Sequence, residues 1–184
     1  MVLPLLAALL MASGLFFGQA TALPERYTAL ALPPRADASP GPVDIVIERW
    51  STPAERDQIV AALKEAGTKG VVKVLQKFPR VGSFGAATAL GHPAQYAWKD
   101  KTADGNERIT ILTDRTIAFW EVTGGSRSLD YPITYIELRI KPNGEGEGEA
   151  IVAARMRYDP FSKGIRLENF DYQPVRLNAV RRLK

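Results

Sequence analysis

Hydrophobic and polar residues alternate with a period of two along most of the chain beyond residue 42. This period is typical of β-strands that bury one face. Short links rich in Gly, Pro, Asn and Asp separate the alternating runs, so neighbouring strands are expected to run antiparallel. The runs that predict strands are 43–50, 95–99, 108–113, 116–122, 131–141, 149–158, 165–172 and 175–183.

Helical spacing replaces this alternation directly after the first predicted strand. Thr52, Pro53 and Glu55 have the spacing of a capping box, which marks the start of a helix. Gly67 is expected to end this helix in a left-handed conformation, and Thr68 is expected to cap a second helix, which stops at Pro79. The apolar stripes of the two helices are Ile59, Leu63 and Ala66, then Val71, Leu75 and Phe78.

These elements predict an α+β fold. It consists of a strongly curved antiparallel sheet, or a partly open barrel, of about seven to eight strands, with the helix pair inserted after the first strand. The apolar faces of the helices are expected to cover the open side of the sheet. The order strand, helix, helix, strands resembles that of helix-grip domains, whose curved sheet holds apolar ligands. Those domains end in a long helix, whereas here Pro174 precedes a strand-like stretch.

The first 22 residues carry no charged side chain and have an apolar centre. They end in Ala20-Thr21-Ala22, which fits a signal-peptidase site. Residues 1–22 are therefore interpreted as a cleaved signal peptide, and the mature protein is expected in the periplasm or outside the cell. An uncleaved membrane anchor is the alternative. Residues 23–42 contain five prolines and many small residues, which predicts a Pro/Ala-rich linker before a single domain over 43–184.

Composition narrows the chemistry that the domain can perform. The 184-residue chain has no cysteine and a single histidine, His92, so it lacks a thiol nucleophile and the ligands of a thiolate or histidine-rich metal site. The motifs of a nucleophile elbow, a zinc protease and a nucleotide-binding loop are all missing from the sequence. No catalytic residue, metal ligand or cofactor is therefore expected.

Charge is spread along the chain, with a formal net charge of +4. The densest basic cluster lies at the C-terminus, and it predicts either a solvated last strand or a contact with an anionic envelope component. Specific binding of nucleic acid is not expected, because basic residues do not gather elsewhere. The cluster consists of Arg176, Arg181, Arg182 and Lys184.

Glycine and glutamate alternate from Gly144 to Glu149, which puts three carboxylates on the same side of an extended chain. Oxygen ligands of this kind suit Ca²⁺, but the Asp/Asn ladder of a calcium loop is absent from the sequence. A flexible hairpin tip is the simpler interpretation, and no metal site is predicted here.

Aromatic residues supply the candidates for a binding site. Tyr96 and Trp98 are two positions apart on a predicted strand and so share one face, while Trp120 and Tyr135 lie on two later strands. Aromatic rings can line a groove for a lipid, a glycan or a peptide. Packing within the core is the alternative for each ring. The predicted ligand-binding residues are Tyr96, Trp98, Trp120 and Tyr135.

Four stretches, spread over most of the predicted domain, carry a resemblance. They are Arg49-Trp50-Ser51-Thr52 with Ala54-Glu55-Arg56-Asp57, Phe78-Pro79-Arg80-Val81-Gly82, Asp130-Tyr131-Pro132 with Thr134 and Ile136-Glu137-Leu138, and Gln173-Pro174-Val175 with Leu177-Asn178 and Val180-Arg181. These stretches resemble a group of exported bacterial proteins of unknown function. The resemblance implies a single exported domain, and it brings no activity and no assigned site.

The function expected from these features is that of an exported, non-enzymatic domain. It would bind an apolar or glycan ligand, or a protein partner, in a groove between the sheet and the helix pair. Two alternatives stay open. One is an envelope-associated structural module that uses the basic C-terminus. The other is a hydrolase that works through two carboxylates, which needs two acids within about 5–10 Å in a cleft. No transmembrane segment is expected after signal cleavage.

Overall fold

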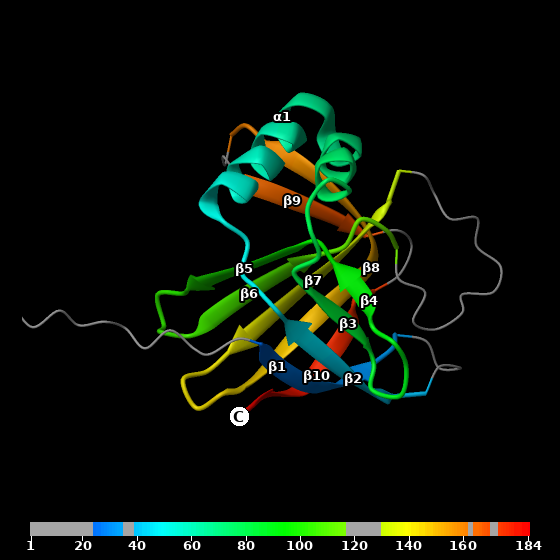
Figure 1. Ribbon diagram of the computed structural model, residues 1–184, viewed down its shortest axis with the longest axis vertical. Helices are drawn as coiled ribbons and strands as arrows, with labels where there is room; N and C mark the ends of the chain where they lie inside the picture. The colour runs from blue at the N-terminus through cyan, green and yellow to red at the C-terminus, as the bar shows by residue number, and fades with distance from the viewer. Residues whose placement is uncertain (1–23, 35–38, 117–129, 162–163, 170–172) are drawn as a thin grey trace, which may run out of the picture.

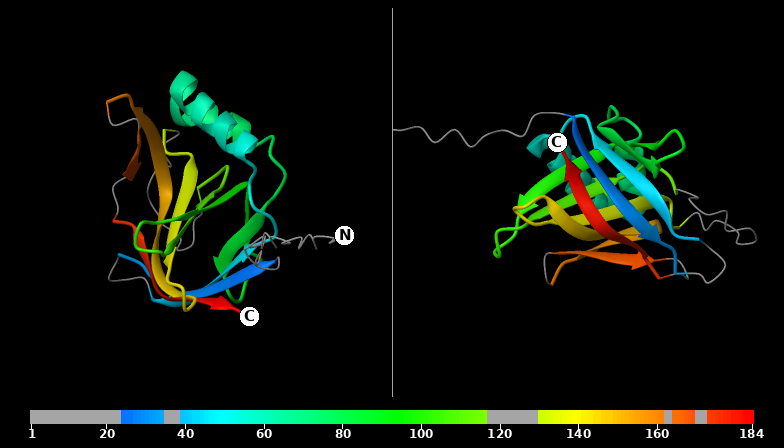
Figure 2. Two further views of the ribbon diagram at one scale, coloured as in Figure 1. Left: turned by 90° about the vertical axis from the view of Figure 1, so that its left-hand side faces the viewer. Right: turned by 90° about the horizontal axis from the view of Figure 1, so that it is seen from below.

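The computed structural model describes residues 24–34, 39–116, 130–161, 164–169 and 173–184. The strands in these residues form one antiparallel sheet that curls into a nearly closed barrel (Figure 1, Figure 2). The strand order is β4-β3-β2-β1-β10-β8-β7-β6-β5, and β9 pairs with the far part of β8. The elements are β1 (Glu25–Leu32), β2 (Gly41–Ile47), α1 (Pro53–Leu75), β3 (Gly82–Ala86), β4 (His92–Ala94), β5 (Tyr96–Lys101), β6 (Glu107–Leu112), β7 (Ile133–Ile140), β8 (Glu145–Asp159), β9 (Gly164–Asn169) and β10 (Val175–Leu183).

The barrel closes where the two ends of the sheet come together. Only Gln95 separates β4 from β5, and its N–H donates to the carbonyl of Leu112 on β6 (3.0 Å). Ser51, which follows β2 in the chain, bridges to β5 with two hydrogen bonds. Its N–H donates to the carbonyl of Ala97 (2.8 Å), and its hydroxyl accepts from the Ala97 N–H (3.1 Å). The segment that leads from β2 into α1 therefore ties the first half of the sheet to the last.

The two faces of the sheet pack against two separate hydrophobic clusters. The first cluster fills the barrel interior and includes Tyr27, Ile45, Phe84, Ile109 and Leu138, all at most 1 % exposed. The second cluster lies on the opposite face of β5–β8 and contains the buried side of α1. The interior of the barrel is thus filled by side chains. The helix covers an outer face of the sheet (Figure 2), whereas the sequence predicted that it covers the open side.

Helix α1 begins at the capping box that the sequence predicts. Gly67, which was expected to end a first helix, lies inside α1, so the predicted helix pair is one helix with a kink. The Thr52 hydroxyl accepts from the Glu55 N–H (3.2 Å), and the Glu55 carboxylate accepts from the Thr52 N–H (2.7 Å), which completes the capping box. At Gly67, a φ of 61° and a ψ of −152° divide the helix into two segments. Thr68 then bonds to the backbone of Met156 on β8, donating to its carbonyl and accepting from its N–H at 2.9 Å each. These bonds fix the second segment to the sheet.

Protonation of Glu55 is expected to weaken the start of α1. Two hydrogen bonds from the Arg49 guanidinium (2.8 and 3.1 Å) outweigh the effect of burial and lower the pKa of Glu55 from 4.5 to about 2. Because the pKa is lowered in the folded state, the stabilisation is complete above about pH 4.5 and is lost as the pH falls towards 2. We expect Glu55→Gln to reduce the free energy of unfolding by about 1 kcal/mol at pH 6 and by much less near pH 2.

Urea unfolding of the wild type and Glu55→Gln at these two pH values measures the change. Glutamine can still accept the capping hydrogen bond, so the variant isolates the charge of Glu55. Glu65→Gln on the exposed side of α1 is the matched control, and its stability at pH 6 is expected within about 0.5 kcal/mol of wild type. An equal deficit of Glu55→Gln at both pH values would show that the carboxylate charge does not stabilise the helix.

The structure corrects the boundaries that the sequence predicted for the folded part. The prediction of a linker over 23–42 is wrong for Glu25–Leu32, which forms β1 between β2 and β10. Tyr27, Ala29 and Ala31 on this strand are buried. None of the prolines that suggested a linker lies within β1, so its alternation is not interrupted. Pro24, Pro33 and Pro34 flank β1, while Pro40 precedes β2 and Pro42 lies at its start. The described fold therefore begins at Glu25 and not at Val43.

The α+β class and the curved antiparallel sheet are confirmed, but the finer prediction needs two changes. The described part of the chain has ten strands where about seven to eight were expected, because β1 was assigned to the linker and β3 and β4 were not recognised as separate strands. For the same reason, the helix follows the second strand and not the first. The predicted signal peptide 1–22 lies outside the described residues, and so does the predicted strand 116–122 except for Thr116.

Candidate functional site

A groove of about 640 Å³ lies between the first half of α1 and the outer face of the sheet. Strands β5 to β9 supply the rest of its lining, and Figure 1 shows α1 and β9 together on this side of the barrel. The volume falls within the range of about 300–1,000 Å³ that is usual for small-molecule sites. The lining residues are Arg56, Ile59, Val60, Tyr96, Trp98, Asp100, Arg108, Thr110, Leu112, Tyr135, Glu137, Met156, Tyr158, Ile165 and Leu167.

Polarity changes along the length of this groove. Strands β5, β6 and β7 are paired in register, so residues on their outer face form rows across the sheet. The rows are Tyr96–Leu112–Tyr135, then Trp98–Thr110–Glu137, then Asp100–Arg108–Arg139. The first row belongs to the hydrophobic cluster under α1, and the last row is charged and lies near the β5–β6 hairpin. The groove therefore has an apolar end and a polar end.

Both carboxylates of the polar end are already hydrogen-bonded. Asp100 accepts from the indole Nε1 of Trp98 (2.8 Å) and from the guanidinium of Arg108 (3.4 Å). Glu137 accepts from the phenol of Tyr135 (2.8 Å) and from Nε of Arg139 (3.1 Å). In each case an aromatic residue donates to the acid two positions along its own strand. These bonds hold the rings of Trp98 and Tyr135 in fixed orientations at the groove.

Arg56, which lines the groove, brings a cation to the ring of Trp98. Its guanidinium carbon lies 5.1 Å from the centre of the Trp98 ring, which is within the range of a cation–π interaction. Arg56 comes from the first turns of α1, three residues before the buried Ile59, and so it shares the helix face that points towards the sheet. Among the described residues, its guanidinium makes no ion pair with a carboxylate.

Burial keeps the tyrosines of the groove protonated. It raises the pKa of Tyr96 well above its usual value of 10, and the acids around it add to the rise. Burial raises the pKa of Tyr135 in the same way, and the neighbouring Glu137 raises it further. Both phenols are therefore neutral at physiological pH, where they can donate hydrogen bonds but cannot act as general bases.

The groove contains two acids, but their surroundings do not suit hydrolysis. Asp100 and Glu137 are on strands separated by β6 and are offset by two residues in register, which puts their backbones roughly 12 Å apart. Each carboxylate already accepts from an arginine and an aromatic donor. A general acid or base must turn an oxygen towards its substrate, and both oxygens of each carboxylate are engaged here by donors from the protein itself. The arrangement therefore favours fixed ion pairs over a catalytic pair.

Three of the four predicted ligand-binding residues line this one groove. Tyr96, Trp98 and Tyr135 come from two different strands and lie on the same face. The fourth, Trp120, lies outside the described residues. Sequence reasoning missed Arg56, although its spacing from Ile59 on the predicted helix was a usable signal. It also missed the residues of β8 and β9, because a sequence does not show which strand the helix meets.

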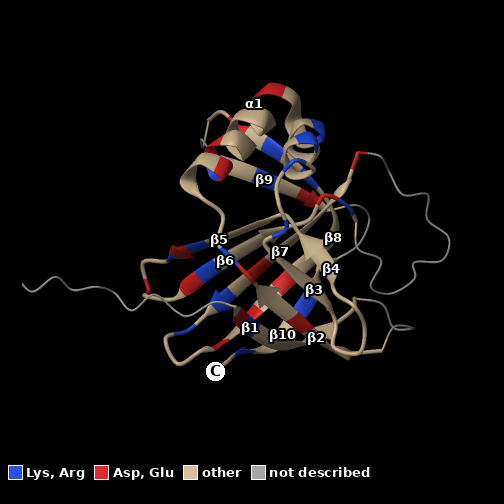
Figure 3. Ribbon diagram, viewed as in Figure 1, with Lys and Arg blue, Asp and Glu red and all other residues tan. Residues whose placement is uncertain are grey.

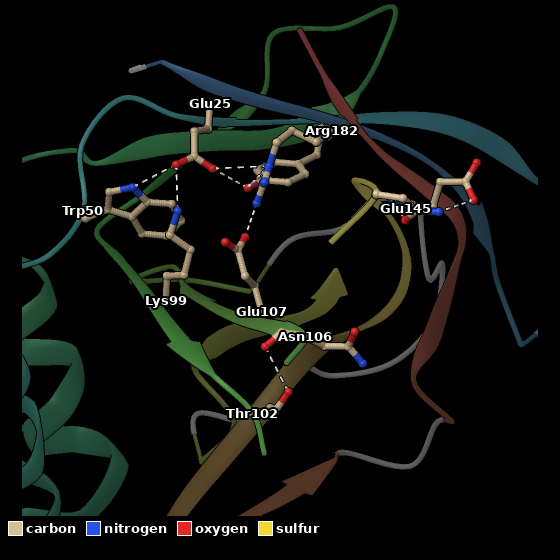
Figure 4. Close-up of polar contacts among 10 residues, drawn as sticks. Glu25, Trp50, Lys99, Thr102, Asn106, Glu107, Glu145 and Arg182 are labelled. Carbon is tan, nitrogen blue, oxygen red and sulfur yellow. Dashed lines mark hydrogen bonds and ion pairs between the residues drawn. The ribbon is translucent and has the colours of Figure 1, made fainter. Parts of the chain in front are cut away.

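A second polar cluster closes one end of the barrel interior (Figure 4). It is centred on Glu25, which is 2 % exposed. One carboxylate oxygen accepts from Nζ of Lys99 (2.9 Å) and Nε1 of Trp50 (3.3 Å). The other accepts from the hydroxyl of Tyr27 (2.5 Å) and lies 3.6 Å from Nε of Arg182. Burial raises the pKa of Glu25, but these donors and charges outweigh it, so the pKa is lowered overall and Glu25 is ionised.

A bulge in β10 turns the side chain of Arg182 into the barrel, where it joins the Glu25 cluster. Ala179 on β10 has a positive φ of 49° and lies where the pairing of β10 with both neighbours shifts register. Such a bulge reverses the alternation, so that Val180 and Arg182 face inwards after it. Arg182 pairs there with Glu107 and donates to the Tyr27 hydroxyl (3.2 Å). Glu25 is buried at the centre of the cluster, and the side chains of Lys99, Arg182 and Glu107 around it are 22–23 % exposed. These contacts between β1, β5, β6 and β10 make the cluster a structural element of the barrel.

The predicted basic cluster at the C-terminus is divided by these contacts. Arg182 belongs to the interior, whereas Arg176 and Arg181 lie opposite Glu149 and Glu145 on β8. Figure 3 shows acidic and basic segments interspersed along the strands in this view.

The glycine–glutamate alternation from Glu145 onwards is part of β8, which is paired on both sides. Its interpretation as a flexible hairpin tip is therefore wrong. Within the described residues no group of three acids or histidines is placed to hold a metal ion.

Within the described part of the chain, no helix has both the length and the low polarity needed to cross a lipid bilayer. The resemblance to exported bacterial proteins stays a prediction. Comparison of the chain with protein-family models, with curated proteins and with solved structures finds no match.

Proposed function

We propose that this protein is a non-enzymatic binding domain that holds a small amphipathic molecule in the groove beside α1. One observation carries the proposal: Tyr96, Trp98 and Tyr135 lie together in a groove whose lining changes from apolar to charged along its length. Aromatic rings offer a large contact area at a small loss of conformational entropy. The sequence singled out these three residues independently of the fold.

The aliphatic residues of the lining favour a ligand with a hydrocarbon part. Ile59, Leu112, Met156 and Leu167 surround the aromatic rings at the apolar end of the groove. A glycan needs polar partners around most of its hydroxyl groups, because an unpaired hydroxyl is costly to bury. Hydrocarbon needs none, and each buried methylene contributes about 0.8 kcal/mol. The lining therefore supports an amphipathic ligand over a glycan.

The alternatives from the sequence receive less support. The hydrolase needs two acids that turn towards a substrate, and both acids of the groove are paired with arginines of the protein itself. The envelope module needs a free basic patch, whereas Arg182 is used inside the barrel. That the domain works outside the cytoplasm is also a proposal, and it is supported by the pattern of residues 1–22 and by the resemblance to exported bacterial proteins.

Titration with N-phenyl-1-naphthylamine, an uncharged apolar dye whose fluorescence rises on leaving water, tests the groove. We expect the wild type to bind one dye molecule per chain. Val60→Trp adds a large ring to a half-buried position in the lining and is expected to weaken binding at least about tenfold. Ala61→Trp is the matched control, because Ala61 is the next residue on the helix and is exposed. It is expected to bind the dye as the wild type does.

Folding of both variants is checked by circular dichroism. An NMR measurement on the wild type needs no variant. Dye binding is expected to shift the indole N–H resonance of Trp98 and to leave unchanged that of Trp50, which donates to Glu25. A wild type that binds no dye, or a Val60→Trp protein that is folded and binds it equally well, would contradict the proposal.

A further inference from the structure

At the polar end of the groove, the acids already have cationic partners, whereas the arginines keep unused hydrogen-bond donors. This difference indicates which head group the ligand carries. The two carboxylates, Asp100 and Glu137, each accept hydrogen bonds at both of their oxygens. Each acid also has an arginine at one oxygen, and this positive charge weakens its attraction for a cationic ligand. The acids are therefore poor recognition groups for a ligand.

The arginines at this end have spare donors. A guanidinium carries five N–H donors. Arg108 is exposed, and its only ion pair with a described residue is a long contact of 3.4 Å with Asp100. Arg56 lies over the Trp98 ring and, within the described part of the chain, pairs with no carboxylate. Both side chains line the groove. An anionic head group that reached this end would meet unused donors from two sides.

We propose that the ligand is an anionic amphiphile, with its carboxylate, phosphate or sulfate group between Arg56 and Arg108 and its hydrocarbon chain along Trp98 towards Tyr96 and Met156. The inference rests on the proposed function, because it assigns a ligand class to the same groove. The charged row and the apolar row lie four residues apart along β5, which is about 13 Å at the usual rise per residue. This span suits a medium-length alkyl chain.

Displacement of N-phenyl-1-naphthylamine by decanoate, decanol and decyltrimethylammonium tests the head group at constant chain length, with each compound kept below its micelle concentration. We expect decanoate to displace the dye at a concentration roughly tenfold lower than decyltrimethylammonium, with decanol between them, since a charge-assisted pair with arginine contributes about this factor. Decyl phosphate and decyl sulfate, tested beside decanoate, identify which anion is preferred.

Two variants assign the preference to residues. Arg56→Gln and Arg108→Gln are each expected to remove most of the advantage of decanoate over decanol, while the concentration of decanol that displaces the dye changes less than about twofold. Arg56→Lys keeps the charge and is expected to restore part of the advantage, which a loss of packing on Trp98 would not explain. Arg80→Gln, at an exposed arginine paired with Glu48 outside the groove, is the control and is expected to behave as the wild type.

The outcomes separate this inference from the proposed function. Equal displacement by all three compounds would overturn the anionic head group and leave the apolar groove standing. Stronger displacement by the ammonium compound would show that the acids recognise the ligand, and would also overturn it. If the dye does not bind, or if no amphiphile displaces it, the proposed function itself fails.

Discussion

Replacing Glu25 by glutamine is expected to destabilise the protein by about 3 kcal/mol at pH 7. Glu25 accepts from Lys99, Tyr27 and Trp50, and its side chain is 1 % exposed. Glutamine keeps the size of the side chain but removes the charge. Within the described part of the chain, Lys99 then has no ion-pair partner, and of the two acids beside Arg182 only Glu107 remains. Removing one member of a buried ion pair is costly because the remaining charge stays out of water.

The exposed pair between Glu48 and Arg80 supplies the control for this prediction. Its nitrogen–oxygen distance is 2.8 Å, almost the same as the 2.9 Å between Lys99 and Glu25, but its side chains are about half exposed. Glu48→Gln is therefore expected to cost less than about 1 kcal/mol. Urea unfolding measures both values. Similar losses for Glu25→Gln and Glu48→Gln would show that burial does not set the strength of the Glu25 contacts.

Two further measurements test the origin of the effect. In a Lys99→Met background, Glu25→Gln is expected to cost at least about 1 kcal/mol less than in the wild type, because the lysine charge is no longer left behind. The pKa of Glu25 is lowered in the folded protein, so its charge stabilises the fold above its usual pKa of 4.5. The difference between wild type and Glu25→Gln is thus expected to narrow below about pH 4.5.

Local sequence signals predicted the local features of this fold well. The capping box at Thr52 and the break at Gly67 depend on residues close together in the chain, and both are present. The alternating runs predicted the β5–β6 and β7–β8 hairpins for the same reason. They did not predict that β6 pairs directly with β7, because a further strand was expected between them at 116–122. Tyr96 and Trp98 share a face because they are two positions apart on one strand, which needs no knowledge of the rest of the fold.

Features that depend on distant pairing were not predictable in this way. Alternation shows which residues share a face, but it does not show which face points into the barrel, so the helix was expected on the wrong side. The Glu25 cluster joins the two ends of the chain, and the hydrogen bond between Tyr27 and Arg182 spans 155 positions. It also depends on the bulge at Ala179, where a single residue of positive φ turns Arg182 inwards. Neither the Glu25 cluster nor the bulge at Ala179 is marked by a pattern of neighbouring residues in the sequence.

Replacing Gly146 by alanine is expected to destabilise the protein by about 3 kcal/mol or more. Here β8 runs so close to β7 that an added Cβ would overlap the carbonyl oxygen of Arg139. A backbone carbonyl in a paired strand cannot move aside as a flexible side chain can. The overlap can be relieved only by separating β7 from β8, and β8 is also held by β10 on its other edge. The loss is therefore expected to include ladder hydrogen bonds as well as the steric overlap.

Gly41→Ala is the matched control for this steric argument. Gly41 also lies on a strand, β2, but an added Cβ there has no neighbouring atom within 4 Å. Alanine loses less backbone entropy on folding than glycine, so Gly41→Ala is expected to leave the stability unchanged or to raise it by up to about 1 kcal/mol. Gly148→Ala, whose added Cβ would lie 2.5 Å from the Glu137 carbonyl oxygen, is expected to resemble Gly146→Ala. If urea unfolding finds Gly146→Ala as stable as Gly41→Ala, the steric argument is wrong, and the close approach of β7 does not explain the glycines of β8.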